Sequence, residues 1–219
     1  MIVKNADPGL LGFDVNQPVS PIIAAAMKTA GYSFCIRYIP RTPALASGNL
    51  TAPEIQNILG AGLSLMAVQH CPLPGWHSSA DLGKSYGEYA ASYAQSIGLP
   101  AGMNIWLDLE EVAAGTPVSD TINYCNQWWQ SLTDAGYSPG LYVGYNPGIN
   151  SDQLYKSLKF KKYWKAYNYD NGVSVRGFCM LQQTQKTLNG ITFDPNKTQK
   201  DNLGECRGVI APASCFWVY

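Results

Sequence analysis

Residues 9–158 repeat one pattern five times: an apolar segment with strand periodicity, followed by a segment with helical periodicity. The strand-like segments are 9–15, 32–39, 63–70, 103–110 and 141–145. The helix-like segments are 22–30, 55–59, 81–97, 116–136 and 151–158. Strands that alternate with helices in this way favour a parallel sheet covered by helices on its outside.

Start and stop signals support these helices. Ser20 and Pro21 form an N-cap and first-turn pair, and Gly31 closes the same segment. Thr51 and Glu54 have the spacing of a capping box. We therefore expect the helices to begin close to these residues.

After residue 158 the helical pattern stops. Three further strands are predicted at 163–168, 178–184 and 191–194, with turn signals at Asp170-Asn171-Gly172 and Leu188-Asn189-Gly190. Five strands plus three make eight, the number that closes a barrel. We expect an α/β TIM-like barrel of five strand–helix units followed by three strands with little helix between them. One domain should span 1–219, with 197–219 as an irregular tail packed on the barrel.

The charge balance excludes some functions. Fifteen basic residues balance fifteen acidic ones, so neither a nucleic-acid footprint nor a membrane-surface patch is indicated. No apolar run is long enough to span a bilayer, and the N-terminus lacks the layout of a secretory signal. An action outside the cytoplasm would then require a secretion system, a phage lysis route or a trimmed leader.

The cysteines and histidines do not follow a metal-binding pattern. The six cysteines form no C-x-x-C pair and no Cys/His ligand spacing, and His70 and His77 read as groove or loop residues. We expect no metal and no cofactor. Cys206 and Cys215 flank a short loop and are close enough in sequence for a disulfide, and the other cysteines read as small buried residues.

The segment 104–111 carries two acids on the reverse of an apolar strand. Ile105, Leu107 and Leu109 fall on one face, whereas Trp106, Asp108 and Glu110 fall on the other. Buried carboxylates are costly unless they are solvated or used. A pair of carboxyl groups at the end of a buried strand is what a sugar hydrolase needs.

Two more acids follow barrel strands. Asp14 ends the first strand and Asp194 ends the eighth, which are neighbours in a closed barrel. Four carboxyl groups on one rim should raise the pKa of at least one of them, which keeps a general acid protonated near neutral pH.

Each acid also has a purely structural interpretation. Asp14 has the position to cap the following turn or to pair with Arg37, and Asp194 precedes a proline as turn formers do. Glu111 shares the outward parity of Leu109 and reads as a solvated or capping residue.

Several motifs resemble a known family. Gly12-Phe13-Asp14-Val15-Asn16-Gln17, Trp106-Leu107-Asp108-Leu109-Glu110 and Gly190 to Asn196 resemble the family-25 glycoside hydrolases, the Chalaropsis-type lysozymes. Phe34 to Tyr38, Thr51-x-x-Glu54 and Gly140 to Tyr145 are closer to a sister family, the glycoside-hydrolase-like domain of unknown function number 1906. The resemblance covers residues 10 to about 197. The stretch 71–77 has no counterpart in it.

The resemblance implies a muramidase that cleaves peptidoglycan at the β-1,4 bond between N-acetylmuramic acid and N-acetylglucosamine. Glu110 would be the general acid, and Asp108 would stabilise positive charge or orient the substrate acetamido group. Asp14 and Asp194 would shape the site. The sugar contacts implied are Gln69, Tyr142, Trp164 and Gln183.

Two other functions stay open on the sequence: a module that binds cell-wall glycan without cleaving it, and a hydrolase of another glycan. The wall-cutting hypothesis fits a phage endolysin or a delivered antibacterial toxin, and a toxin would have an immunity protein as partner. We expect a monomer that acts in the periplasm or the extracellular wall.

Overall fold

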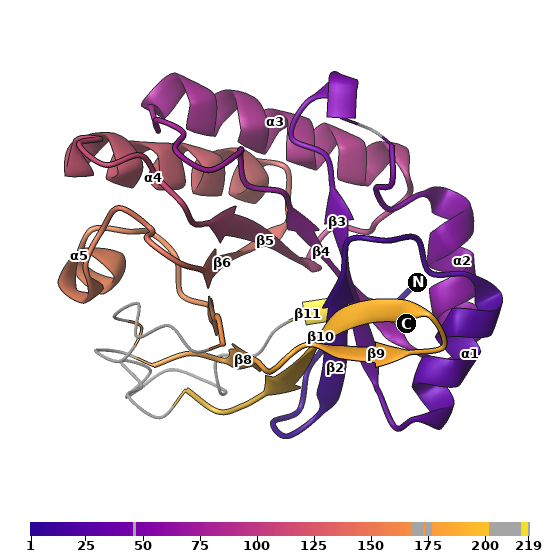
Figure 1. The fold of residues 1–219 in the computed structure, drawn as a ribbon. Coiled ribbons are helices and arrows are strands. Elements are labelled where there is room, and N and C mark those ends of the chain that lie inside the picture. Colours follow the sequence, from indigo (N-terminus) through magenta and orange to yellow (C-terminus); the bar gives the residue numbers. More distant parts are fainter. Residues whose placement is uncertain (46, 168–172, 174–176, 202–215, 219) are drawn as a thin grey trace.

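The computed structural model describes residues 1–45, 47–167, 173, 177–201 and 216–218 (Figure 1). The predicted turn at 170–172 and the cysteines at 206 and 215 lie outside this part. No helix among the described residues is long and apolar enough to cross a membrane.

Eight strands close a barrel. Its members are β2 (Leu11–Val15), β3 (Phe34–Ile39), β4 (Ser64–Gln69), β5 (Asn104–Leu109), β6 (Ser138–Val143), β7 (Tyr163–Lys165), β8 (Met180–Gln182) and β10 (Ile191–Thr198). The order is β4-β3-β2-β10-β8-β7-β6-β5, and the β4–β5 pairing completes the circle. The predicted α/β barrel is confirmed.

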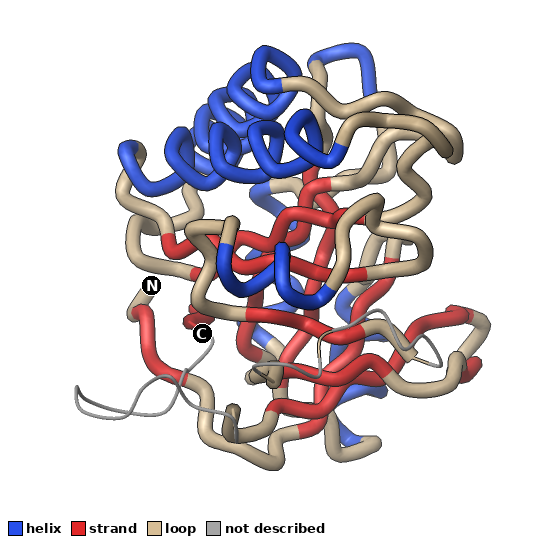
Figure 2. Tube along the Cα trace, turned by 90° about the vertical axis from the view of Figure 1, so that its left-hand side faces the viewer, coloured by secondary structure: helices blue, strands red, loops and turns tan. Residues whose placement is uncertain are grey.

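Five helices connect the first strands, as the sequence predicts. They are α1 (Pro21–Thr29), α2 (Ala52–Gly60), α3 (Ala80–Ser96), α4 (Val118–Asp134) and α5 (Ser151–Lys156). α3 and α4 lie side by side on the outside of the barrel (Figures 1 and 2). The glycine at position 83 permits their close contact, since a Cβ added there would lie 2.1 Å from the carbonyl oxygen of Tyr124.

The last barrel strand runs against the others. β10 is antiparallel to both β2 and β8, and the seven other barrel strands are parallel to their remaining neighbours within the barrel. Before β10 the chain forms a hairpin with β9 (Lys186–Leu188), whose turn places Asn189 and Gly190 at positive φ. Asp194 therefore lies within this strand, and the expectation that it ends the strand is wrong.

The C-terminal stretch is also more regular than expected. Lys197 and Thr198 continue β10, and Phe216–Val218 form β11. This strand pairs antiparallel with β1 (Val3–Asn5), and Val218 pairs with Leu65 of β4. The expectation of an irregular tail is wrong for these residues.

Alternation along the strands separates two apolar clusters. The smaller one fills the barrel interior with Phe34, Ile36, Met66, Val68, Trp106, Trp164 and Met180. The larger one lies between the strands and the helices and includes Phe13, Cys35, Leu65, Ile105 and Leu107. Side chains that point into the barrel from the C-terminal ends of the parallel strands therefore meet above this apolar layer.

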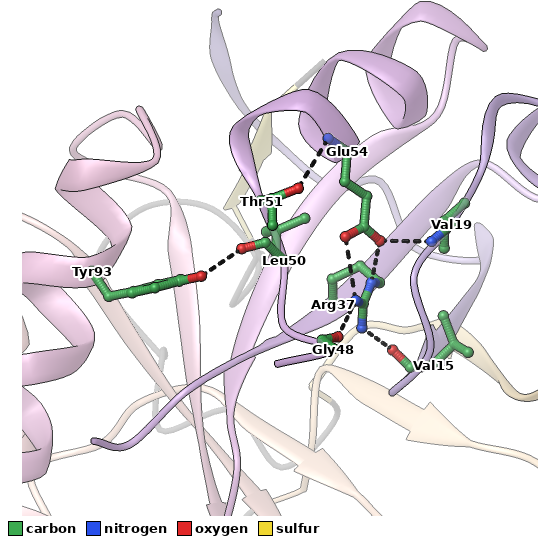
Figure 3. Close-up of polar contacts among 8 residues, drawn as sticks. All are labelled: Val15, Val19, Arg37, Gly48, Leu50, Thr51, Glu54 and Tyr93. Atoms are coloured by element: carbon green, nitrogen blue, oxygen red, sulfur yellow. Dashed lines mark hydrogen bonds and ion pairs between the residues drawn. The ribbon is translucent and has the colours of Figure 1, made fainter. Parts of the chain in front are cut away.

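Arg37 belongs to the helix-facing side and not to the barrel interior. Its Nε donates to Glu54 Oε1 at 2.5 Å, and its Nη1 donates to the Val15 carbonyl at 2.7 Å (Figure 3). Glu54 also accepts from the Val19 amide at 2.7 Å. Only half of the predicted capping box forms, because Thr51 accepts from the Glu54 amide while the Glu54 carboxylate is used by Arg37.

Candidate active site

The end of the barrel at which the parallel strands finish collects polar side chains. Four acids lie there, two on β5 and its continuation, one on β2 and one on β10. The hydroxyl of Tyr142 on β6 is influenced by all of them: burial raises its pKa first, and the charges of Asp108, Glu110, Asp14 and Asp194 raise it further.

Asp14 is buried in a hydrogen-bond network inside the barrel. Its Oδ2 accepts from Asn196 Nδ2 at 2.7 Å and from Gln182 Nε2 at 3.1 Å, and its Oδ1 accepts from the Tyr38 hydroxyl at 3.4 Å. Burial raises the pKa of Asp14 to about 7, against the opposing effect of the Asn196 hydrogen bond. Asp14 therefore does not pair with Arg37, which lies on the other face of the sheet.

Asp194 is the cross-strand partner of Asp14. It is half-buried, and this burial raises its pKa while a hydrogen bond from Gln185 lowers it. The charge of Asp194 adds to the raised pKa of Asp14. The two carboxyl groups thus form one side of the site.

Asp108 lies deep in the site with a relative exposure of 4%. Its Oδ2 accepts from the Cys71 amide at 3.4 Å, whereas its buried Oδ1 has no hydrogen-bond partner among the described residues. Burial, followed by the charge of Glu110, raises the pKa of Asp108 well above its ordinary value. Both effects favour the protonated form of this carboxyl group.

Glu110 is more accessible and is held by its surroundings. The Trp76 indole donates to its backbone carbonyl at 2.8 Å. Its side chain passes directly over Gly144, where an added Cβ would lie 2.1 Å from Oε2. Burial raises the pKa of Glu110, and the neighbouring charge of Glu111 adds to this effect.

The predicted sugar contacts divide into two groups. Tyr142 lies among the acids, and its hydroxyl donates to Gln182 Oε1 at 3.0 Å. Trp164 packs edge-on beneath the Tyr142 ring at a centroid distance of 4.6 Å and is only 1% exposed, so it forms the floor.

Gln69 is not brought to the acids, and the contact that the structure gives for Gln183 is a backbone one. Gln69 lies on the helix-facing side, where its amide donates to the Pro40 and Tyr86 carbonyls and accepts from the Trp128 indole at 2.6 Å. Gln183 uses its backbone amide to pair with Pro195.

Sequence reasoning missed three residues of the site: Gln182, Tyr38 and Cys71. Strand alternation could have predicted Gln182, because it shares a face with Met180, two residues earlier, which lies in the barrel interior. Tyr38 could have been predicted in the same way, because it shares a face with Ile36 of the barrel interior. Its ring packs on His70 at 4.3 Å, and burial lowers the pKa of this histidine to about 4, so the imidazole is neutral at pH 7.

Cys71 follows β4 in a loop and has no periodicity to reveal it. Its sulfur lies 3.7 Å from Glu110 Oε1. The sulfur and one carboxylate oxygen each of Asp108 and Glu110 lie within 4.8 Å of one another, the one group of three potential metal ligands among the described residues.

The fold has counterparts among solved structures. The Tat-secreted protein Rv2525c from Mycobacterium tuberculosis, crystallised with L-tartrate, is 16% identical with a TM-score of 0.64, and the match covers 89% of this chain and 97% of that one. The catalytic domain of endolysin ply40 from a Listeria monocytogenes bacteriophage is 18% identical with a TM-score of 0.63, covering 93% and 100%.

A third structure is the modular Cpl-1 endolysin in complex with a peptidoglycan analogue, in a variant in which one glutamate is replaced by glutamine. It is 16% identical with a TM-score of 0.58, and the match covers 91% of this chain and 57% of that one. No curated protein matches the chain. The chain therefore shares its fold with these endolysins and with Rv2525c, as the resemblance implied.

The family described as "Rv2525c-like, glycoside hydrolase-like domain" matches residues 25–201. That range includes Asp108, Glu110 and Asp194, and it leaves only Asp14 of the four acids outside. The chain belongs to this Rv2525c-like glycoside hydrolase-like family.

Proposed function

We propose that this protein is a muramidase that cleaves the β-1,4 bond between N-acetylmuramic acid and N-acetylglucosamine in peptidoglycan. The observation that carries the proposal is the pair Asp108 and Glu110, two carboxyl groups with raised pKa values in one partly buried site. The likeness to endolysins, one of them bound to a peptidoglycan analogue, supports the choice of substrate.

Glu110 is the general acid in this proposal. It is the more accessible of the two groups and can reach the leaving oxygen of a glycan, whereas Asp108 is almost fully buried. A bound glycan covers Glu110 further, and this desolvation favours its protonated form. The acid then gives its proton to the departing sugar oxygen.

Asp108 is the partner group. The two carboxyl groups are close enough that the ionisation of one favours protonation of the other. Positive charge that develops on the sugar favours the ionised form of Asp108. Its unpartnered Oδ1 is available to stabilise that charge or to accept a hydrogen bond from the substrate acetamido group.

The short separation of the pair supports retention of configuration at the cleaved bond. Oxygens of Asp108 and Glu110 lie within 4.8 Å of each other. An inverting enzyme keeps its two carboxyl groups about 6.5–9.5 Å apart to leave room for a water molecule. We expect NMR of the first products to show the β anomer, and a first product in the α form contradicts this geometry.

The test of the acid is Glu110→Gln, with Glu88→Gln on the exposed face of α3 as a matched control. Removal of a general acid should lower release of reducing ends from purified peptidoglycan by about 100-fold or more, and the control should cleave at the wild-type rate. A protein that binds peptidoglycan but releases no reducing ends is a glycan-binding module and not a muramidase.

A second substrate separates the roles of the two acids. A chitooligosaccharide with an aryl leaving group needs little proton donation, so Glu110→Gln should regain much of the lost rate on it. Asp108→Asn should stay inactive on both substrates. The reverse result assigns the acid role to Asp108.

A further inference from the structure

The site contains a thiol that the proposed hydrolysis does not use. Cys71 lies two residues after β4, and its sulfur is 3.7 Å from Oε1 of Glu110. The Cys71 sulfur and one carboxylate oxygen each of Asp108 and Glu110 form a group of three potential metal ligands. They come from the ends of two neighbouring strands and lie within 4.8 Å of one another.

A second observation points to a ligand at this place. Oδ1 of Asp108 is buried without a hydrogen-bond partner, although the residue is only 4% exposed. An orphaned carboxylate oxygen in such surroundings is costly unless a proton or a cation compensates it. The other oxygen of the same carboxyl group, Oδ2, already accepts a hydrogen bond from the Cys71 backbone amide, which leaves Oδ1 as the oxygen available to a metal ion.

The spacing fits a small tetrahedral cation. With a Zn–S distance of about 2.3 Å and a Zn–O distance of about 2.1 Å, neighbouring ligand atoms in a tetrahedron are about 3.6 Å apart. The contact between the Cys71 sulfur and the Glu110 oxygen has nearly this length. An oxygen of Asp108 lies within 4.8 Å of both atoms and would have to move closer to reach the same distance.

We propose that Cys71, Asp108 and Glu110 bind one Zn²⁺ ion and that this ion inhibits the enzyme. A sulfur–zinc bond and two oxygen–zinc bonds form, while the thiol proton of Cys71 and any proton held by the two carboxyl groups leave to solvent. A thiolate ligand selects zinc over the hard cations Mg²⁺ and Ca²⁺. Cys71 and Glu110 are only half-buried, so the fourth position is open to water.

Inhibition follows from the identity of the ligands and rests on the proposed function. A zinc ion at this place takes both carboxyl groups that the muramidase reaction needs, and a metal-bound Glu110 has no proton to give. Zinc binding itself does not depend on that function, so the two hypotheses fail separately.

Cobalt spectroscopy on the intact protein is the first experiment. Co²⁺ in place of zinc should give a sulfur-to-cobalt charge-transfer band and the visible bands of a tetrahedral site. Zn²⁺ should displace it with a stoichiometry of one, and Mg²⁺ or Ca²⁺ should not. A wild-type protein that binds neither ion, or binds Co²⁺ without the sulfur band, overturns the proposal.

Variants then identify the thiol. Cys71→Ser should remove the sulfur band and weaken zinc binding in calorimetry by at least tenfold. Cys125→Ser, whose thiol is buried on α4, and the double variant of Cys206 and Cys215 should keep both signals. Equal zinc affinity in Cys71→Ser and wild type contradicts the assignment, and Cys71→Ala replaces the serine variant if the latter does not fold.

Activity gives the last readout. Zinc should abolish release of reducing ends by the wild-type enzyme, and a chelator should restore it. Stoichiometric zinc binding through Cys71 with undiminished hydrolysis rejects the inhibitory role. Stoichiometric binding by a protein that never cleaves peptidoglycan rejects the muramidase proposal and leaves the metal site standing.

Discussion

Gly144 is the residue that gives the Glu110 side chain its space. A Cβ at this position would lie 2.1 Å from Glu110 Oε2 and 2.6 Å from Glu110 Cβ. The backbone of Gly144 does not need glycine, because its φ is not in the left-handed region. Its role is therefore to leave room for the proposed acid.

Gly144→Ala should displace Glu110 and lower hydrolysis of peptidoglycan by more than about tenfold, since small misplacements of a reacting group are costly. Gly60→Ala is the matched control, because nothing lies within 4 Å of a Cβ there. Kinetics on purified peptidoglycan measure both. Equal loss in the two variants, or none in either, contradicts the role given to Gly144.

Asp14 couples stability to pH. Its pKa is about 7 in the folded protein against 3.8 ordinarily. Below pH 4 both states hold the proton, and above pH 7 neither does. Between these limits only the folded state holds it, so the free energy of unfolding decreases as the pH rises, by an amount of the order of 4 kcal/mol from this group.

Asp14→Asn cannot ionise and should remove that part of the slope. Urea unfolding at several pH values between 4 and 7 measures it. We expect the wild type to lose more stability than the variant as the pH rises through this window. Parallel curves for the two proteins exclude Asp14 as the group that titrates.

Parity along the strands explains which site residues the sequence could predict. Asp14, Asp108, Glu110 and Tyr142 share the parity of interior residues on their strands, so their orientation can be read from alternation. Gln69 has the opposite parity to Met66 and Val68, and it faces the helices. Cys71 was not predicted because loop geometry decides where its sulfur lies.

At the scale of elements, the ion pair of Arg37 and Glu54 ties three segments together. Arg37 lies on β3 and Glu54 on the first turn of α2 (Figure 3). Arg37 donates to the carbonyl of Val15, the last residue of β2, and Glu54 accepts from the amide of Val19, between β2 and α1. Arg37 is fully buried. Either charge would be costly to bury without its partner.

Arg37→Met leaves Glu54 buried and unpaired, and should lower the free energy of unfolding by about 3–5 kcal/mol. The double variant Arg37→Met/Glu54→Leu removes both charges and should recover much of this loss. Urea unfolding compares them. A double variant less stable than the single one shows that the contacts to Val15 and Val19, and not the charge, determine the stability.

The capping signals predicted the helices well because they are local. Ser20 accepts from the Ile23 amide and Thr51 from the Glu54 amide, as their spacing indicates. The direction of β10 is different. Its antiparallel course depends on pairing with β2, about 180 residues earlier in the chain, and no local pattern encodes such a contact.

At the scale of the whole molecule, β10 is the strand that closes the barrel. It joins β2, the first barrel strand, to β8, and its Asp194 and Asn196 meet Asp14 there. Without β10 the sheet has two open edges and the Asp14 side of the site is incomplete. Closure and the site therefore depend on the same long-range contact.

Two truncations separate closure from the strands outside the barrel. A chain ending at Thr184 lacks β10 and should show no cooperative unfolding and no native near-ultraviolet circular dichroism, since the edges of β2 and β8 stay unpaired. A chain ending at Asp201 keeps all eight barrel strands and loses the β11 pairing with β1 and β4. It should unfold cooperatively at a lower temperature and still release reducing ends from peptidoglycan. If the chain ending at Asp201 does not fold, β11 is as necessary as β10, and closure of the eight strands is not sufficient for a stable molecule.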